Sequence, residues 1–153
     1  MEDKIIANLK WPPELKNNII TMDSSYQPSG NVHLMSVKGF LFYSNPMSSY
    51  GGNLSQLTPQ DFLLISLSSC QFLTFYSLAV KARLGLIYYE DNSEMFLGGN
   101  KIKFSEKIVL DLKMKFNETQ KHDKVLELCH KAYKYCIIGN SIKTNIEFKL
   151  EII

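Results

Sequence analysis

The longest apolar stretch of the chain covers residues 62–80, and these 19 consecutive residues carry no charge. Thr58, Pro59 and Asp61 stand just before it. They suit the N-cap, the first helical position and the acidic partner of a capping box. The sequence therefore predicts a helix that starts at Thr58 and ends just before Gly85. A helix that is apolar on nearly all sides is typical of a buried, central position.

A membrane-spanning helix is the alternative reading of this stretch, because about 20 apolar residues are enough to cross a bilayer. The stretch also contains hydroxyl and amide side chains, namely Ser66, Ser68, Ser69, Gln71, Thr74, Tyr76 and Ser77. Lipid would leave these groups without partners, and no second span is present to receive them. We therefore expect a core helix and no membrane association.

Apolar and polar residues alternate along the second half of the chain, as they do in strands with one buried face. Residues 87–97 and 101–116 flank Gly98-Gly99-Asn100, which predicts a hairpin. A final strand is predicted through Ile146, Phe148, Leu150 and Ile152.

A second helix is predicted from about Glu118 to Ile138, with Gly139-Asn140 as its end. Its apolar stripe consists of Val125, Leu128, Cys129, Ala132, Tyr133 and Cys136. Residues 18–26, 32–37 and 40–43 are predicted to be short strands. The order of strands, helix, hairpin, helix and strand indicates an α+β protein with helices on an antiparallel sheet. At this length we expect a single domain over residues 1–153.

Composition narrows the classes of function. The net charge is +2, and no basic run alternates with aromatic residues, so nucleic-acid binding is not indicated. His122 and His130 have no metal-ligand spacing, so we expect no metal site. The chain begins Met1-Glu2-Asp3 without a secretory signal pattern, and its three cysteines lack a disulfide-like spacing. We therefore expect a cytoplasmic protein.

The three cysteines are Cys70, Cys129 and Cys136. Cys129 and Cys136 are seven residues apart in one predicted helix, which separates them by about 10 Å. A disulfide needs Cα atoms within roughly 7 Å, so these two cannot pair while that helix is intact. Cys70 therefore pairs with one of them or with neither. All three could also be small, inert core residues.

Two motifs resemble the OsmC/Ohr family of osmotically induced and organic hydroperoxide resistance proteins. The first is the helix motif over residues 58–70, preceded by the Gly51-Gly52 loop. The second is Lys134-Tyr135-Cys136, followed by Ser141-Ile142. The order of elements between the motifs also agrees, and the likeness covers roughly residues 30–153.

The resemblance implies an OsmC-like fold, with a sheet wrapped around a central helix pair in an intertwined homodimer. It also implies a peroxidase without a metal or organic cofactor. Cys70 would attack an organic hydroperoxide and become a sulfenic acid. Cys136 would resolve this acid as a disulfide, and an external dithiol would reduce the pair.

The chain departs from the family at the group that activates the thiol. Peroxidase members use an arginine of the N-terminal strands, whereas this chain has one arginine, Arg83, which lies 13 residues beyond Cys70. Arg83 is about 20 Å along the helix and cannot serve its own Cys70. Lys38 is a weaker substitute because it lacks the planar fork of arginine. In one branch of the family the acid corresponds to Asp61, which is at least as well suited to capping the helix, whereas in the hydroperoxide-resistance branch the acid corresponds to Gln60.

Two functions therefore remain open. The first is a thiol-dependent peroxidase that uses Cys70, Cys136 and Asp61. The second is a protein that keeps the fold without efficient peroxidase activity and binds a small apolar ligand or a partner.

Overall fold

The structure is a computed structural model, and it describes residues 4–11, 33–38, 40–52 and 56–153. Two compact units are distinguished along the chain. The larger unit comprises Met1–Glu14 and Leu64–Ile153, and the smaller unit is Leu15–Leu63. The expected organisation as one domain over residues 1–153 stays a prediction.

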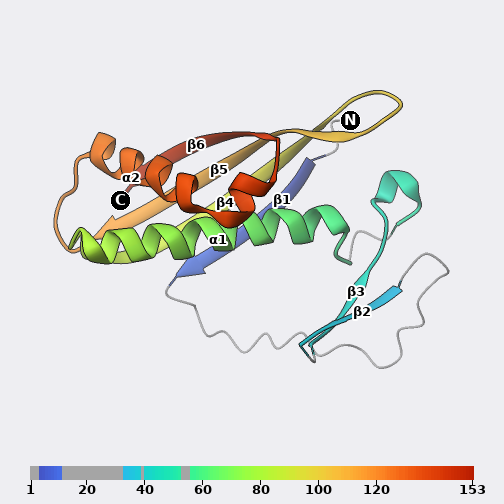
Figure 1. Cartoon of the computed structure of the whole chain (residues 1–153), viewed down its shortest axis with the longest axis horizontal. Helices are drawn as coiled ribbons and strands as arrows, with labels where there is room; N and C mark the ends of the chain where they lie inside the picture. Colours follow the sequence, from blue (N-terminus) through green and yellow to red (C-terminus); the bar gives the residue numbers. More distant parts are fainter. Residues whose placement is uncertain (1–3, 12–32, 39, 53–55) are drawn as a thin grey trace. The chain divides into compact units, whose positions relative to one another are not determined.

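The larger unit contains a four-stranded sheet in the order β1-β4-β5-β6 (Figure 1). Its strands are β1 (Lys4–Trp11), β4 (Leu86–Gly98), β5 (Phe104–Phe116) and β6 (Asn145–Ile152). β4 and β5 pair in antiparallel fashion, as predicted, and β1 pairs antiparallel with β4, but β6 runs parallel to β5. The α+β class is confirmed, and the sheet is mixed because the chain crosses over between its last two strands.

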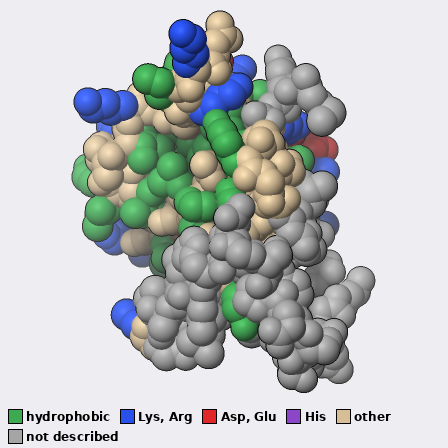
Figure 2. All heavy atoms as spheres, turned by 90° about the vertical axis from the view of Figure 1, so that its right-hand side faces the viewer, with side chains coloured by type: hydrophobic (Ala, Val, Ile, Leu, Met, Phe, Trp, Pro, Cys, Tyr) green, Lys and Arg blue, Asp and Glu red, His purple; other side chains and the backbone are tan. Residues whose placement is uncertain are grey.

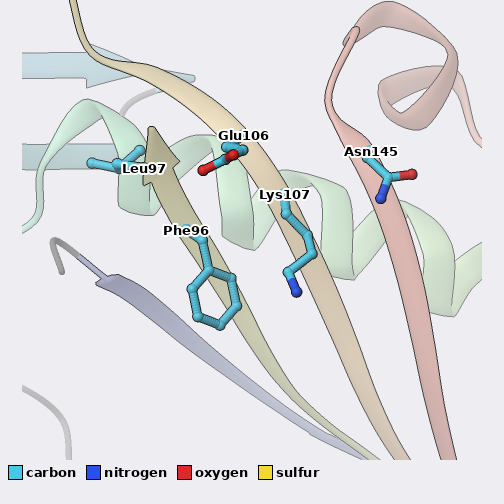
Figure 3. Close-up of a pocket in the computed structure, with 5 residues that line it drawn as sticks. All are labelled: Phe96, Leu97, Glu106, Lys107 and Asn145. Atoms are coloured by element: carbon cyan, nitrogen blue, oxygen red, sulfur yellow. The ribbon is translucent and has the colours of Figure 1, made fainter. Parts of the chain in front are cut away.

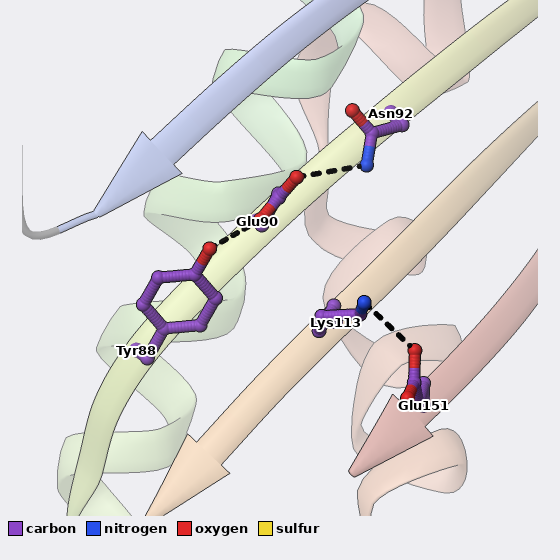
Figure 4. A network of polar contacts seen from close by, with 5 residues as sticks. All are labelled: Tyr88, Glu90, Asn92, Lys113 and Glu151. Atoms are coloured by element: carbon purple, nitrogen blue, oxygen red, sulfur yellow. Dashed lines mark hydrogen bonds and ion pairs between the residues drawn. The ribbon is translucent and has the colours of Figure 1, made fainter. Parts of the chain in front are cut away.

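The sheet has a buried face and a polar face. The inward residues of β5 are Ile108, Leu110, Leu112 and Met114. On the polar face, Lys113 forms an ion pair with Glu151 at 3.1 Å across the parallel pair. Tyr88 and Asn92 both donate hydrogen bonds to Glu90 on the same face (Figure 4). This face is suited to solvent, so the apolar face is the one that the helices cover.

Helix α1 (Pro59–Lys81) begins where the sequence predicts. The Asp61 carboxylate accepts hydrogen bonds from the Thr58 N–H at 2.6 Å and from the Thr58 hydroxyl at 2.7 Å. The Asp61 N–H donates to the Thr58 hydroxyl oxygen at 3.3 Å, which completes the capping box. The helix ends three residues earlier than expected, because Arg83 already has a left-handed backbone with φ 53°.

The inner side of α1 packs at helical spacing and is nearly inaccessible to solvent. Its buried residues are Leu64, Leu67, Ser68, Gln71, Phe75 and Ala79. The outer side is apolar but exposed, and its large residues are Ile65, Leu73, Tyr76 and Val80. The central helix is therefore only half covered within one chain.

Among the described residues, α1 is the one helix whose length and composition would allow it to cross a bilayer. Two polar groups on its inner side are engaged by the protein. The Ser68 hydroxyl donates to Asp91, and the Gln71 amide donates to the Cys129 carbonyl at 3.0 Å. These contacts fit a core helix that packs on a sheet.

The predicted second helix is interrupted at Cys136. Helix α2 (His122–Tyr135) stops there, and a short helix, α3 (Ile137–Ser141), follows. The expectation that Gly139-Asn140 ends the helix is wrong, because both residues lie inside α3. Sequence periodicity continues through this point, and the break arises from the contacts described below.

The β4–β5 hairpin is confirmed, but its second strand begins at Phe104 and not at Lys101. The turn requires glycine at position 99, where φ is 87° and a Cβ would lie 2.1 Å from the Ile102 carbonyl oxygen. Strand β1 was missed by the sequence reading, although apolar residues alternate at positions 5, 7, 9 and 11.

The smaller unit contains a two-stranded sheet of β2 (His33–Val37) and β3 (Phe40–Ser44), close to the predicted bounds. The strand predicted over residues 18–26 lies outside the described residues. A single 3-10 turn, η1 (Ser48–Tyr50), leads to Gly51, whose φ is 83°. Buried Asn45 ties this loop to the start of α1, since its side chain donates to the Gln56 and Leu57 carbonyls.

Candidate active site

Cys70 and Cys136, which lie 66 residues apart in the sequence, are brought together in the larger unit. Cys70 lies in the middle of α1 and is half-buried, whereas Cys136 is buried at the junction of α2 and α3. The two thiols lie close enough for each to shift the pKa of the other. The backbone of Ile137 and Ile138 also lowers the pKa of Cys70. The junction between the two short helical segments therefore forms one wall of the site.

The position of Cys136 is fixed by its role as a cap. It has an extended backbone, and its sulfur accepts a hydrogen bond from the Gly139 N–H at 3.2 Å. The Asn140 amide donates to the Cys136 and Lys134 carbonyls at 2.8 and 2.9 Å, which satisfies groups that the end of α2 leaves free. The Tyr133 hydroxyl donates to the Gly139 carbonyl at 3.0 Å.

The two thiols are electrostatically unequal. Burial alone would raise the pKa of Cys70, but hydrogen bonds from Cys136, Ile138, Ile137 and Thr74 outweigh it, and the pKa lies below its usual value. Burial and the bond to Cys70 raise the pKa of Cys136 to about 11. Cys70 therefore ionises first, and the Cys136 S–H donates to the resulting thiolate.

Cys129 has a separate environment. It is fully buried on α2, and burial together with the nearby Asp91 raises its pKa to about 12. A thiol that stays protonated at neutral pH is a poor nucleophile. The structure therefore associates Cys70 with Cys136 and leaves Cys129 in the core.

A buried polar cluster of Asp91, Ser93 and Ser68 lies between β4 and the part of α1 that carries Cys70. Asp91 on β4 accepts hydrogen bonds from the Ser68 hydroxyl at 2.5 Å and the Ser93 hydroxyl at 2.7 Å. Burial raises the pKa of Asp91 to about 6 despite these bonds. The sequence reading missed this residue, although Asp91 occupies an inward position of the alternating pattern between Tyr89 and Met95.

Asp61, a predicted site residue, and the two cations weighed in the sequence, Lys38 and Arg83, each have their own surroundings. Asp61 lies in the first turn of α1, where its carboxylate is occupied by Thr58. Lys38 is an exposed residue of the smaller unit with φ 48°. Arg83 is exposed beyond the end of α1. Among the described groups that set the pKa of Cys70, none is a cation.

Several residues next to the two cysteines along the chain have exposed apolar side chains. Ile137, whose backbone lowers the pKa of Cys70, has a 76% exposed side chain. Leu73, one helical turn after Cys70, is 62% exposed, and Tyr135 beside Cys136 is 64% exposed. Elsewhere, on the end of the molecule that faces the viewer in Figure 2, hydrophobic side chains also reach the surface. An apolar reactant would therefore meet apolar surface near Cys70.

A hollow of about 470 Å³ lies away from the thiols, where β4, β5 and β6 come together. It is lined by Phe96, Leu97, Glu106, Lys107 and Asn145 (Figure 3). The Lys107 ammonium pairs with Glu147 at 3.5 Å and lies over the Phe96 ring. No thiol lines this hollow, and its cation is already engaged, so the thiol pair is the better candidate for chemistry.

The comparisons with known proteins agree with this arrangement. Residues 51–151 match the family model of OsmC-like proteins, and the chain belongs to this family. No curated protein shows significant similarity to the chain.

Solved structures show the same fold. An OsmC-like protein of unknown function from Vibrio cholerae superposes with a TM-score of 0.72 at 22% identity, over 99% of each chain. An OsmC-like protein from Mycoplasma pneumoniae has a TM-score of 0.67 at 13% identity, over 99% of this chain and 97% of its own. An organic hydroperoxide resistance protein from Elizabethkingia anophelis has a TM-score of 0.63 at 16% identity, over 84% and 97%.

A Gly139→Ala substitution should loosen the wall that holds Cys136. The new Cβ would lie 2.4 Å from a ring carbon of Tyr133, so the ring or α3 must move. We expect a loss of about 1–3 kcal/mol in the free energy of unfolding, measured with urea. Ser141→Ala, an exposed substitution in the same helix, is the control. Equal stability of the two variants would contradict this account of the junction.

The Asp91 cluster should make stability depend on pH. The folded pKa of about 6 lies above the ordinary value of 3.8. The folded protein therefore binds more protons between these values, and this contribution to stability is present at low pH and lost as pH rises through about 6.

Asp91→Asn should remove that dependence. Relative to the variant, the wild type should lose on the order of 3 kcal/mol in the free energy of unfolding between pH 4 and pH 7. Urea unfolding at several pH values measures it, with the exposed Glu118→Gln as control. A difference between wild type and variant that is constant across this range would disprove the role of Asp91.

Proposed function

We propose that this protein is a cytoplasmic cysteine-based peroxidase that reduces organic hydroperoxides. The observation that carries the proposal is the contact between Cys70 and Cys136, in which one thiol is favoured to ionise and the other to remain protonated. This asymmetry suits a nucleophile and a resolving thiol. Family membership and neighbours named organic hydroperoxide resistance proteins support the same class of substrate.

The proposed reaction begins with the Cys70 thiolate, which attacks the distal oxygen of the hydroperoxide. The O–O bond breaks, the sulfur becomes a sulfenic acid, and the alkoxide takes a proton and leaves as an alcohol. Cys136 then attacks the Cys70 sulfur, and a disulfide and one water form. An external dithiol reduces this disulfide to two thiols and is itself oxidised to a disulfide.

The N–H groups of Ile137 and Ile138 have a defined role in this scheme. They stabilise negative charge on the Cys70 sulfur without adding a titratable group. Because they belong to the segment that follows Cys136, the resolving thiol and the donors move together. The exposed apolar side chains of Leu73 and Ile137 favour a substrate with an apolar body.

We also propose that the active form is a homodimer built on the exposed side of α1. An isologous interface places residues near the symmetry axis against their own copies, so like charges there would repel. Residues 62–80 carry no charge, and Leu73 and Val80 are 62% and 58% exposed within one chain. A second copy of α1 covers these side chains without burying a charge.

One observation favours the alternative, a protein that binds a small apolar ligand or a partner. No cation among the described groups acts on Cys70, whereas several residues near it along the chain have exposed apolar side chains. Such a protein would keep its thiols reduced or oxidise them slowly and without selectivity. The next experiment separates the two functions.

Reduced protein treated with an alkyl hydroperoxide should form a Cys70–Cys136 disulfide within seconds, detected by peptide mass spectrometry. Cys70→Ser should abolish oxidation, because the nucleophile is lost. Cys136→Ser should stop at a trappable sulfenic acid on Cys70, and Cys129→Ser should react like the wild type. Unchanged thiols, or slow oxidation that includes Cys129, would support the ligand-binding alternative.

Leu73→Glu should convert the dimer into a monomer, because the buried interface would then hold two unpaired carboxylates. Light scattering of the purified protein should show the mass fall by half. Ile102→Glu, at a residue that is 82% exposed in the hairpin turn, should leave the dimer intact. A monomeric wild type at micromolar concentration would refute the dimer.

A further inference from the structure

Two large apolar side chains are exposed together at the turn between β4 and β5. Ile102 is 82% exposed, the highest value for a large hydrophobic residue in the described part of the chain, and Phe104 is 56% exposed. The turn projects beyond the neighbouring ends of β1 and β6 (Figure 1). Single apolar side chains at a surface are ordinary, but a pair on a projecting turn indicates a contact surface.

The backbone of the turn is held in one shape. The close approach of Gly99 to the Ile102 carbonyl oxygen leaves no room for another residue type at position 99. The Phe104 ring lies along the same glycine, because its Cε1 would be 3.1 Å from a Cβ there. Ile102 is therefore presented at the apex of a preformed turn, and little conformational entropy is lost when this turn binds.

The apolar apex has positive charge on both sides. Lys101 and Lys103 flank Ile102, and both lysines are exposed. Residues 98–105 contain no acidic residue, and Glu106 lies against Gly98 at the end of the strand. Lysine and hydrophobic side chains stand next to each other at the top of Figure 2, where the turn projects. Long lysine stems let the ammonium groups reach past an apolar contact.

Charges on the strands below the turn are balanced by pairing. Lys107 forms an ion pair with Glu147 at 3.5 Å, and Lys4 forms one with Glu94. Both of these lysines also lie over the Phe96 ring. The attraction for an anionic partner is therefore strongest at the turn itself.

This combination of charge and apolar surface distinguishes between partners. A second copy of the chain in an isologous contact would bring like lysines together near the symmetry axis, so the uncharged stripe of α1 suits self-association better. A nucleic acid would need an aromatic platform at the apex, where this turn has an isoleucine. An anionic bilayer offers phosphates to lysines and an apolar boundary to Ile102 and Phe104.

We infer that the turn over residues 101–104 attaches the protein to the surface of membranes that contain anionic phospholipids. Ile102 and Phe104 enter the boundary between headgroups and acyl chains, and Lys101 and Lys103 bind the phosphates. This inference goes beyond the proposed function and does not depend on it. No spanning segment is needed, so α1 keeps its place in the core, and the expectation of no membrane association is revised only for the surface.

Cosedimentation of the full-length protein with vesicles tests this inference. One set of vesicles contains phosphatidylcholine alone, and the other contains equal parts of phosphatidylcholine and phosphatidylglycerol. At low salt we expect binding to the anionic vesicles about tenfold or more stronger than to the neutral ones, since each lysine near an anionic surface strengthens binding about fivefold. High salt should weaken the binding, because it screens these charges.

Two double variants separate the apolar contribution from the charged one. Ile102→Ser with Phe104→Ser should lower the affinity for anionic vesicles about tenfold or more, because the apolar area buried on binding is lost. Lys101→Gln with Lys103→Gln should reduce it to the level of neutral vesicles. The matched controls are Ile153→Ser, at a residue that is 52% exposed, and Lys124→Gln, at an exposed lysine of α2, and both should bind like wild type.

A wild-type protein that stays in the supernatant with anionic vesicles at low salt would overturn the inference. Equal binding to both kinds of vesicle would do the same, and so would turn variants that bind like wild type. Light scattering without lipid detects the remaining alternative: a lower mass for the Ile102→Ser, Phe104→Ser variant would assign the turn to a contact between copies. Cys70 oxidation by a soluble hydroperoxide is measured separately, so failure of the peroxidase proposal leaves the vesicle results unaffected.

Discussion

The contact between the middle of α1 and the α2–α3 junction is the constraint on which the site depends. The inner side of α1 is held by Ser68 on Asp91 and by Gln71 on the carbonyl of Cys129. These bonds fix the rotation of the helix, and Cys70, between them in the sequence, must then face the junction. The environment of the Cys70 thiol is therefore a consequence of how two neighbouring polar side chains of α1 are buried.

The three thiols differ because the fold places each of them in a different environment. Cys129 is enclosed in the core beside a carboxyl group, whereas Cys136 ends one helix and begins another. Cys70 alone combines partial exposure with several donors. Hydrogen bonds to a thiolate favour ionisation, and burial opposes it, so the balance between the two decides which thiol has the lower pKa. No charged side chain of the described residues is needed for that order.

Structural features that depend on neighbouring residues in the chain could be predicted from the sequence, whereas features that depend on tertiary contacts could not. The capping box of Thr58 and Asp61 and the hairpin around Gly99 depend on neighbours in the chain, so their residue types were sufficient. The break at Cys136 could not be predicted, because the apolar period continues through it and the cap forms only in the folded junction. The parallel direction of β6 likewise leaves no mark on its alternating pattern.

The residues of the candidate site fall into the same two groups, those that the sequence indicated and those that depend on tertiary contacts. Pairing of Cys70 with Cys136 was one of the alternatives left open by spacing, and family resemblance selected it. Asp91 was overlooked because a single acidic residue in a strand is usually at the surface. Its burial depends on Ser68 and Ser93, which come from two different elements.

The parallel pairing of β6 with β5 also determines when the site can form. Parallel neighbours need a long crossover, and here the crossover consists of α2 and α3 with Cys136 at their junction. Contacts between distant parts of a chain form late in folding, because the entropy of closing the loop must be overcome first. The two sulfurs, 66 residues apart, therefore come together only when distant parts of the chain assemble, and until then each is a separate thiol without the other's influence.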